Sequence, residues 1–326
     1  MGSTIRTPKQ GLFSHIFFVK VVAFYRWLNG ALNGSPKLPL IVNMDECSLA
    51  YHQTGIRGTV LRTQPLRSVR PEDRARLGDR RGNITYMASI CNDPSFSNVL
   101  PQILLGNCQR FAKRVVEELK PSLPGNLFLW REKSAWNNRF QMRRYIKLLR
   151  QCLGDEVFQM REVFLVVDMA SCHLHPSIPA VARSQGLRMV LVPAGLTSIL
   201  QPLDTHVFRP FRAKMQELWL ACRSNHETGE VSLREWLRLV CKAIQAVVCE
   251  QDWEHAFERV GYLYGQALVS PKLLASLEWD SLPLVSPGLP GIGQAASMFP
   301  RKSQANVPMW VEWKDPEPYT RIQTLD

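Results

Sequence analysis

The stretch that decides the fold is residues 163–175, VFLVVDMASCHLH. An apolar run leads to a single carboxylate, Asp168, and the chain then reaches Cys172, His173 and His175. A continuous apolar run of this length is typical of a strand that is buried on both faces, as in the middle of a parallel sheet. Because burying a lone carboxylate is costly, the charge at the end of this strand is expected to be paired, metal-bound or exposed.

The flanking segments predict an α/β domain with five strands. After the strand at 163–170, residues 178–186 predict a short helix that ends at Gly186, and residues 187–193 predict the next strand, which completes a strand–helix–strand unit. Apolar patterns upstream predict three more strands. We therefore expect a central mixed five-stranded sheet that is flanked by helices. The remaining strands are expected at 38–46, 83–93 and 98–106, and the remaining helices at 139–152, 201–222, 232–249 and 253–263.

The composition favours a folded, basic protein that contacts a polyanion. The chain has 326 residues, of which 45% are hydrophobic and 21% charged, and this predicts a sizeable core. Lys and Arg number 40 against 28 Asp and Glu, a net charge of +12, so nucleic acid is the first candidate partner. Lys20 and Arg26 interrupt the apolar stretch 12–28, which therefore predicts a packed helix and no membrane partner.

Composition also divides the chain into three parts. Residues 1–35 predict an N-terminal helical segment and residues 36–265 predict one domain, whereas residues 266–326 are rich in Pro, Gly and Ser and predict a linker or poorly ordered tail. Residues 57–81 are rich in arginine, with Pro and Gly between, and predict a loop. Arg57 and its neighbours in this loop either contact phosphate groups or are simply solvated.

Three aspartates share one geometric property. Asp45 ends the first apolar strand, Asp168 ends the central strand, and Asp204 opens the helix after the last strand. If the first and central strands are neighbours, their ends meet at the crevice where open α/β sheets bind ligands. Oxygen ligands suit Mg²⁺ or Mn²⁺, and a pair of such ions serves phosphoryl transfer. Glu46 is expected to point to the opposite face from Asp45, because successive strand side chains alternate.

The same segments resemble a known family. IVNMDE (41–46) resembles the first-strand motif of the DDE-type transposase domain of the pogo/Tigger group, and VVDMASCH (166–173) resembles its second-acid motif. PAGLTSILQPLDTHVFRPFR (193–212) is similar to its long third-acid block. SAWNNRFQMRRYI (134–146) and WEHAFERVG (253–261) resemble its helix before the fourth strand and its closing segment.

The resemblance implies a ribonuclease-H-like (integrase/transposase) fold and metal-dependent cleavage or transfer of DNA strands. Catalytic and metal-binding roles fall to Asp45, Asp168 and Asp204, which would hold two Mg²⁺ or Mn²⁺ ions. His173 would orient an acid or touch the scissile phosphate, or else be a structural histidine. Arg209 and Arg212 join Arg57 as candidate phosphate contacts. The resemblance also implies a nuclear location, and it leaves a homodimer open.

Departures from the family pattern leave a second function open. Met169 stands where the family usually has Asn, Ser171 where Pro is usual, and Gly195 replaces a loop Asn. Residues 1–35 are too few for the helix-turn-helix domains of this group, so we expect that this chain cannot find transposon ends unaided. The alternative is a domesticated or decaying transposase relic that is catalytically silent and only binds nucleic acid.

Cysteines and tryptophans raise two weaker alternatives. The eight cysteines are irregularly spaced and form no CxxC, which predicts buried free thiols in a reducing compartment. A zinc module on Cys172, His173 and His175 is disfavoured because the spacing is too tight for common zinc fingers. Trp136, Trp219, Trp236 and Trp253 lie in or beside helical patterns, so they predict core packing rather than base stacking.

Overall fold

The computed structural model describes residues 21, 24, 25, 27, 28, 30–49, 84–109, 111–224 and 231–262. The predictions for the arginine-rich loop 57–81, including Arg57, and for the tail 266–326 lie outside the described residues.

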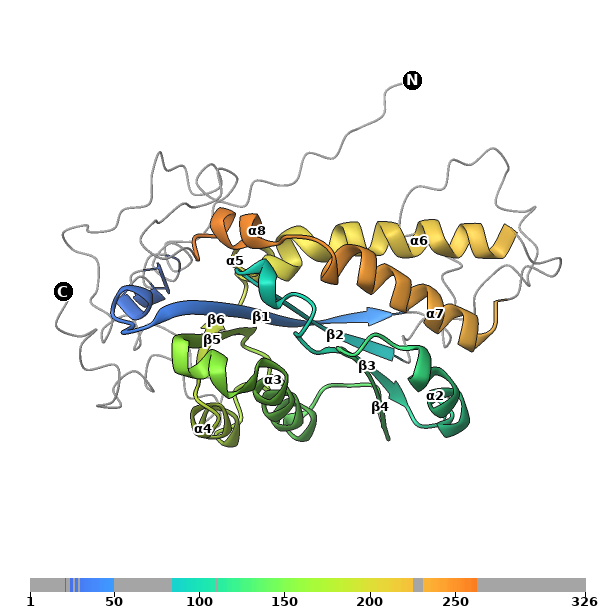
Figure 1. Cartoon of the computed structure of the whole chain (residues 1–326), viewed down its shortest axis with the longest axis horizontal. Coiled ribbons are helices and arrows are strands. Elements are labelled where there is room, and N and C mark those ends of the chain that lie inside the picture. The colour runs from blue at the N-terminus through green and yellow to red at the C-terminus, as the bar shows by residue number, and fades with distance from the viewer. Residues whose placement is uncertain are drawn as a thin grey trace, which may run out of the picture.

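A six-stranded mixed sheet forms the middle layer of the domain (Figure 1), with the strands in the spatial order β4-β3-β2-β1-β5-β6. The pairs β1–β2 and β2–β3 are antiparallel, whereas β3–β4, β1–β5 and β5–β6 are parallel. The predicted mixed α/β fold is therefore confirmed and is consistent with a ribonuclease-H-like domain. The strands are β1 (Leu38–Leu49), β2 (Ile84–Cys91), β3 (Gln102–Asn107), β4 (Leu127–Glu132), β5 (Arg161–Asp168) and β6 (Leu187–Val192).

The prediction of five strands is wrong by one, because β4 carries only a weak sequence signal. It is six residues long, pairs with β3 alone in the described sheet, and buries only Leu127 and Trp130 of its side chains. A short edge strand of this kind has neither a continuous apolar run nor a long alternation. Asp204 consequently follows the sixth strand and not the fifth.

Helices cover both faces of the sheet (Figure 1). On one face lie α6 (Phe208–Ser224), α7 (Leu233–Ile244) and α8 (Glu254–Arg259); on the other lie α2 (Lys113–Leu119), α3 (Arg139–Met160) and α4 (Ser177–Ser184). The shorter helices are η4 (Pro94–Phe96), η5 (Lys120–Ser122), α5 (Thr197–Leu200), η6 (Leu203–Val207) and η7 (Gln245–Cys249). Within these described ranges, no helix is both long and apolar enough to cross a bilayer.

Local signals explain most of these helix boundaries. Ser232 and Glu235 form the predicted capping box at the start of α7. Gly186 has a φ of 75° after α4, as expected for the residue that ends a helix. The predicted helix 201–222 is divided instead: the π-helical turn η6 carries Asp204, and α6 follows. Pro210, which has no N–H to donate, lies in the first turn of α6, where the missing donor is tolerated.

The two ends of the described chain pack together. The described residues between 21 and 33 are helical, as predicted for the apolar stretch that precedes β1. The Tyr25 hydroxyl donates a hydrogen bond of 2.8 Å to the carbonyl oxygen of Val260, and the Phe24 and Tyr262 rings meet edge to face. Tyr25, Phe24 and Tyr262 are all buried, so this helix belongs to the core of the domain.

The cysteines and tryptophans follow their predictions in part. All eight cysteines are free thiols as predicted, but only three of them are buried. Trp219, Trp236 and Trp253 are buried as predicted, but Trp136 is 75% exposed, so its assignment to the core is wrong. The reason is its position: α3 begins at Arg139 behind the cap Asn138, and Trp136 lies in the preceding loop.

Candidate active site

The parallel pairing of β1 and β5 brings two of the predicted aspartates to the same end of the sheet. The last pair in the register joins Asn43 to Val166. Asp45 and Asp168 each stand two residues beyond this pair, on neighbouring parallel strands. The carboxyl ends of neighbouring parallel strands are where open α/β sheets hold their ligands.

The Asn43 side chain links the turn that carries the third aspartate to the same end of the sheet. The Asn43 side chain is fully buried; its Nδ2 donates to the Val166 carbonyl oxygen at 3.1 Å, and its Oδ1 accepts from the Leu203 N–H at 2.9 Å. Asp204 directly follows Leu203 in η6. Sequence reasoning missed Asn43, although a signal was present: it is a polar residue inside the apolar run of β1, two positions before Asp45 and therefore on the same face.

The three aspartates share one electrostatic environment. Asp45 is only 8% exposed. Burial raises the pKa of Asp45 well above its usual value, and the charges of Glu46, Asp204 and Asp168 raise it further. Burial also raises the pKa of Asp204, with Asp168 adding to the shift and Arg212 opposing it. Carboxylates that repel one another in this way are stabilised by a bound cation, so this donor set fits Mg²⁺ or Mn²⁺.

Asp168 is held by two hydrogen bonds to one oxygen. His173 Nδ1 lies 2.7 Å from Asp168 Oδ1, and the Ala170 N–H donates to the same oxygen at 3.0 Å. Although burial acts to raise the pKa of Asp168, these interactions with His173 and Ala170 hold it below its usual value. Asp168 is therefore the most readily ionised of the three aspartates, and its orientation is fixed by the turn that follows β5.

His173 connects Asp168 to Glu46. Its ring is fully buried, and Nε2 lies 3.4 Å from Glu46 Oε1. Burial acts to lower the pKa of His173, but interactions with Asp168, Cys172 and Glu46 outweigh it and raise that pKa well above its usual value. Glu46 also accepts a hydrogen bond from Asn137 Nδ2, in the loop before α3. The expectation that Glu46 points away from Asp45 agrees with these partners, which lie on the α3 side of the sheet.

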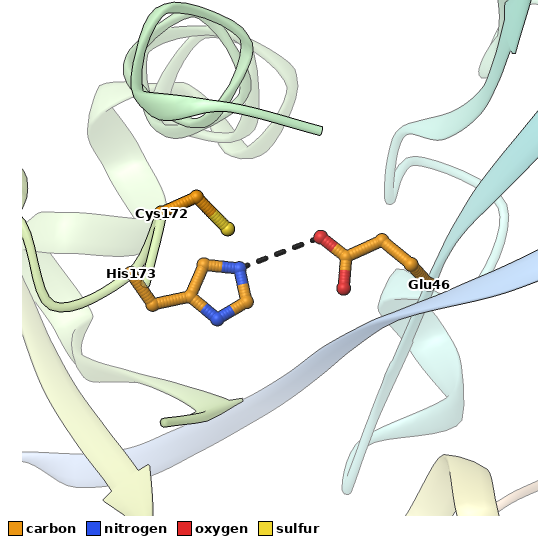
Figure 2. Close-up of side chains that lie close together, drawn as sticks. All are labelled: Glu46, Cys172 and His173. Carbon is orange, nitrogen blue, oxygen red and sulfur yellow. Dashed lines mark ion pairs between the residues drawn. The ribbon is translucent and has the colours of Figure 1, made fainter. Parts of the chain in front are cut away.

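Cys172 completes a second group beside the aspartates. Figure 2 shows the side chains of Glu46, Cys172 and His173 pointing toward one another. Within the described ranges, this is the one set of three such side chains whose ligand atoms all lie within 4.8 Å of one another. His175 does not belong to it, since His175 contacts Ser177 Oγ at 2.9 Å and Arg139 Nη1 at 3.1 Å. The zinc module on Cys172, His173 and His175 is therefore not assembled.

The predicted phosphate contacts differ in their surroundings. Arg209 is exposed on α6. Arg212, one turn further along α6, places Nη2 3.7 Å from Cys47 Sγ and its guanidinium over the Phe208 ring. The charge of Arg212 opposes the rise in the pKa of Asp204, so Arg212 interacts with that aspartate.

A family model described as DDE superfamily endonuclease matches residues 84–257. The chain belongs to this family. The match includes Asp168 and Asp204 and begins after Asp45, so Asp45 joins them through the sheet geometry alone. DDE superfamily endonucleases are transposase-type enzymes that generally use divalent metals, and DNA is the partner that this family implies. No curated protein and no solved structure gives a significant match to the chain.

Proposed function

We propose that this DDE superfamily endonuclease cleaves or transfers DNA strands at phosphodiester bonds, with Asp45, Asp168 and Asp204 as ligands of two Mg²⁺ or Mn²⁺ ions. The observation that carries the proposal is the position of the buried Asp45, which lies two residues beyond the last β1–β5 pair, as Asp168 does on the neighbouring strand. Burial, and then the charges of Glu46, Asp204 and Asp168, raise the pKa of Asp45. Carboxylates that are buried and repel one another are frequent at functional sites, and a bound cation relieves their repulsion.

The residues around the aspartates would take separate roles. The bound ions would activate an oxygen nucleophile and neutralise charge on the leaving oxygen. His173 and the Ala170 N–H hold Asp168 Oδ1, so they fix the direction of that carboxylate. Asn43 holds η6 against β1 and thereby fixes how far Asp204 lies from the sheet. Arg212 beside Asp204, and the exposed Arg209, offer contacts to DNA phosphates.

The alternative, a silent relic that only binds nucleic acid, rests on the substituted motif residues. Two of them are compatible with the fold. Gly195 has a φ of 85°, a conformation that glycine adopts without strain, and Met169 packs partly buried against the core. All three acids are retained and face a common environment. No observation on the described residues favours the relic over the enzyme.

Mn²⁺ binding in the presence of a short DNA duplex tests the proposal. We expect the wild-type chain to bind Mn²⁺ and Asp168→Asn to lose this binding, because the substitution keeps the shape and removes the charge. Asp155→Asn is the matched control, since Asp155 is an exposed carboxylate on α3 that pairs with Arg150. DNA binding without Mn²⁺ binding in either protein would contradict the enzyme and favour the silent relic.

Membership of the pogo/Tigger group and a nuclear location remain predictions that rest on the family resemblance. A homodimer remains a separate prediction.

A further inference from the structure

We propose that Glu46, Cys172 and His173 form a second cation site, selective for Zn²⁺ or a similar borderline metal, which ties the turn after β5 to β1. The site is distinct from the aspartates in its donor atoms, one oxygen, one sulfur and one nitrogen. Zn²⁺ accepts this combination, whereas Mg²⁺ takes oxygen ligands and rejects a thiolate.

The spacing of the donor atoms fits a tetrahedral metal. Ligands about 2.0–2.3 Å from a tetrahedral Zn²⁺ stand roughly 3.3–3.7 Å apart from one another. His173 Nε2 and Glu46 Oε1 already lie 3.4 Å apart, and all three ligand atoms lie within 4.8 Å of one another. Cys172 is partly exposed, and its Sγ faces the other two ligand atoms (Figure 2).

Two buried polar atoms point to a missing ligand at this place. His173 Nε2 is buried in a side chain that is 0% exposed, and it makes an ion pair with Glu46 Oε1 at 3.4 Å but no hydrogen bond. Asn137 Oδ1 is also buried without a hydrogen bond, although Asn137 Nδ2 donates to Glu46. Buried nitrogen and oxygen atoms without partners are rare and costly. A metal ion accepts the lone pair of Nε2 directly.

The surroundings of His173 resemble those of metal-binding histidines in one physical respect. His173 Nδ1 faces the Asp168 carboxylate at 2.7 Å and the Asp168 carbonyl oxygen at 3.1 Å. A proton on Nδ1 satisfies both acceptors, and a metal at Nε2 would displace the proton that pairs with Glu46 in the cation-free protein. A histidine that donates to a carboxylate on one side and ligates on the other is the usual arrangement in metal sites. Asn137 orients Glu46 in the same way from the opposite side.

The fold shows what such a site would hold in place. The paired register of β1 and β5 ends at Asn43 and Val166, so the segments beyond it have no ladder between them. Glu46 lies on the first of these segments, and Cys172 and His173 lie on the turn that follows the second. A cation that bridges these two segments would hold them together where no hydrogen bonds pair β1 with β5. It would also fix the Asp168 carboxylate through His173.

Co²⁺ as a spectroscopic probe tests this site without reference to catalysis. In the purified chain with excess Mg²⁺, we expect Co²⁺ to give a thiolate-to-metal charge-transfer band that Zn²⁺ abolishes. Cys172→Ser should remove the band, and Glu46→Gln should weaken Co²⁺ binding more than about 10-fold. Cys222→Ser is the control, since Cys222 is a partly exposed thiol on α6. A wild-type chain without the band, or a band that survives Cys172→Ser, would overturn the site.

Two further measurements keep the result clear. In the unsubstituted chain, Zn²⁺ should slow the alkylation of Cys172 by iodoacetamide and leave the alkylation of Cys222 unchanged. Equal rates of Cys172 alkylation with and without Zn²⁺ would overturn the site. This measurement needs no variant, so it holds even if a variant fails to fold. Asp204→Asn should remove Mn²⁺ binding and keep the Co²⁺ band. A chain that binds Co²⁺ through Cys172 but never Mn²⁺ would therefore support this site and contradict only the proposed nuclease function.

Discussion

Asn43 and Leu203 are joined by a hydrogen bond across 160 positions of the chain, from the Leu203 N–H to the Asn43 amide oxygen at 2.9 Å. This bond connects strand β1 to the π-helical turn that carries Asp204. The same amide donates to the carbonyl oxygen of Val166 on β5. A single buried side chain thus fixes the relative positions of the three segments that carry the aspartates.

Asn43→Ala is expected to destabilise the fold by about 1–3 kcal/mol, because it leaves a buried N–H without its acceptor. It should also weaken Mn²⁺ binding, since η6 and Asp204 lose their attachment to β1. Urea unfolding measures the first effect and Mn²⁺ titration the second. The control is Asn107→Ala, which removes a partly exposed amide at the end of β3. Equal losses of stability in the two variants would contradict this role for Asn43.

Asp45→Asn is expected to stabilise the chain in EDTA near neutral pH. The folded-state pKa of Asp45 lies well above 3.8, so above that pH the folded protein binds a proton that the unfolded chain has released. Folding stability therefore falls as pH rises from 3.8 through the raised folded-state value. The asparagine variant lacks this dependence.

Unfolding temperatures across this pH range check the prediction for Asp45. Mn²⁺ should raise the unfolding temperature of the wild type and leave Asp45→Asn unchanged. Asp155→Asn removes the same charge from an exposed position and should keep the wild-type pH dependence. A variant at Asp45 that is less stable than the wild type near neutral pH in EDTA would show that the carboxylate is not strained.

The sequence was sufficient for features that depend on neighbouring residues. Strands β1, β5 and β6 follow from apolar runs, and α7 follows from its capping box, because each signal is complete within a few residues. The edge strand β4 was missed because four of its six side chains are only partly buried. Trp136 was assigned to the core because an aromatic residue near a helix was treated as part of its periodicity.

Only the residues of the site that lie at strand ends or in recognisable motifs could be predicted from the sequence. The aspartates could be placed together from the rule for parallel strands, but the group of Glu46, Cys172 and His173 could not. It joins β1 to a turn far along the chain, and its spacing in the sequence contains no pattern. Asn43 stands out as a polar residue in an apolar run, but its role was missed because its partners Val166 and Leu203 are 123 and 160 positions away.

Gly261→Ala is expected to destabilise the chain by about 1–3 kcal/mol, the cost of forcing a residue with a side chain into a strained backbone conformation. Gly261 has a φ of 78°, and an added Cβ would lie 2.5 Å from the Tyr25 ring. The strain would therefore also displace the N-terminal helix. Gly125→Ala is the control, because its added Cβ meets no atom within 4 Å. Thermal unfolding of the two variants distinguishes them, and equal unfolding temperatures would contradict this packing.

Arg209→Gln is expected to weaken DNA binding equally for all sequences, because an arginine that contacts phosphate carries no base information. The slope of log affinity against log salt concentration should fall in magnitude by about 1 for one lost phosphate contact. Fluorescence anisotropy with a labelled duplex at several salt concentrations measures this slope. Arg114→Gln is the matched control, since Arg114 is an exposed arginine on α2 that pairs with Glu118. If both variants reduce the slope to the same extent, the basic surface acts only through its net charge. The DNA would then not contact the start of α6 specifically.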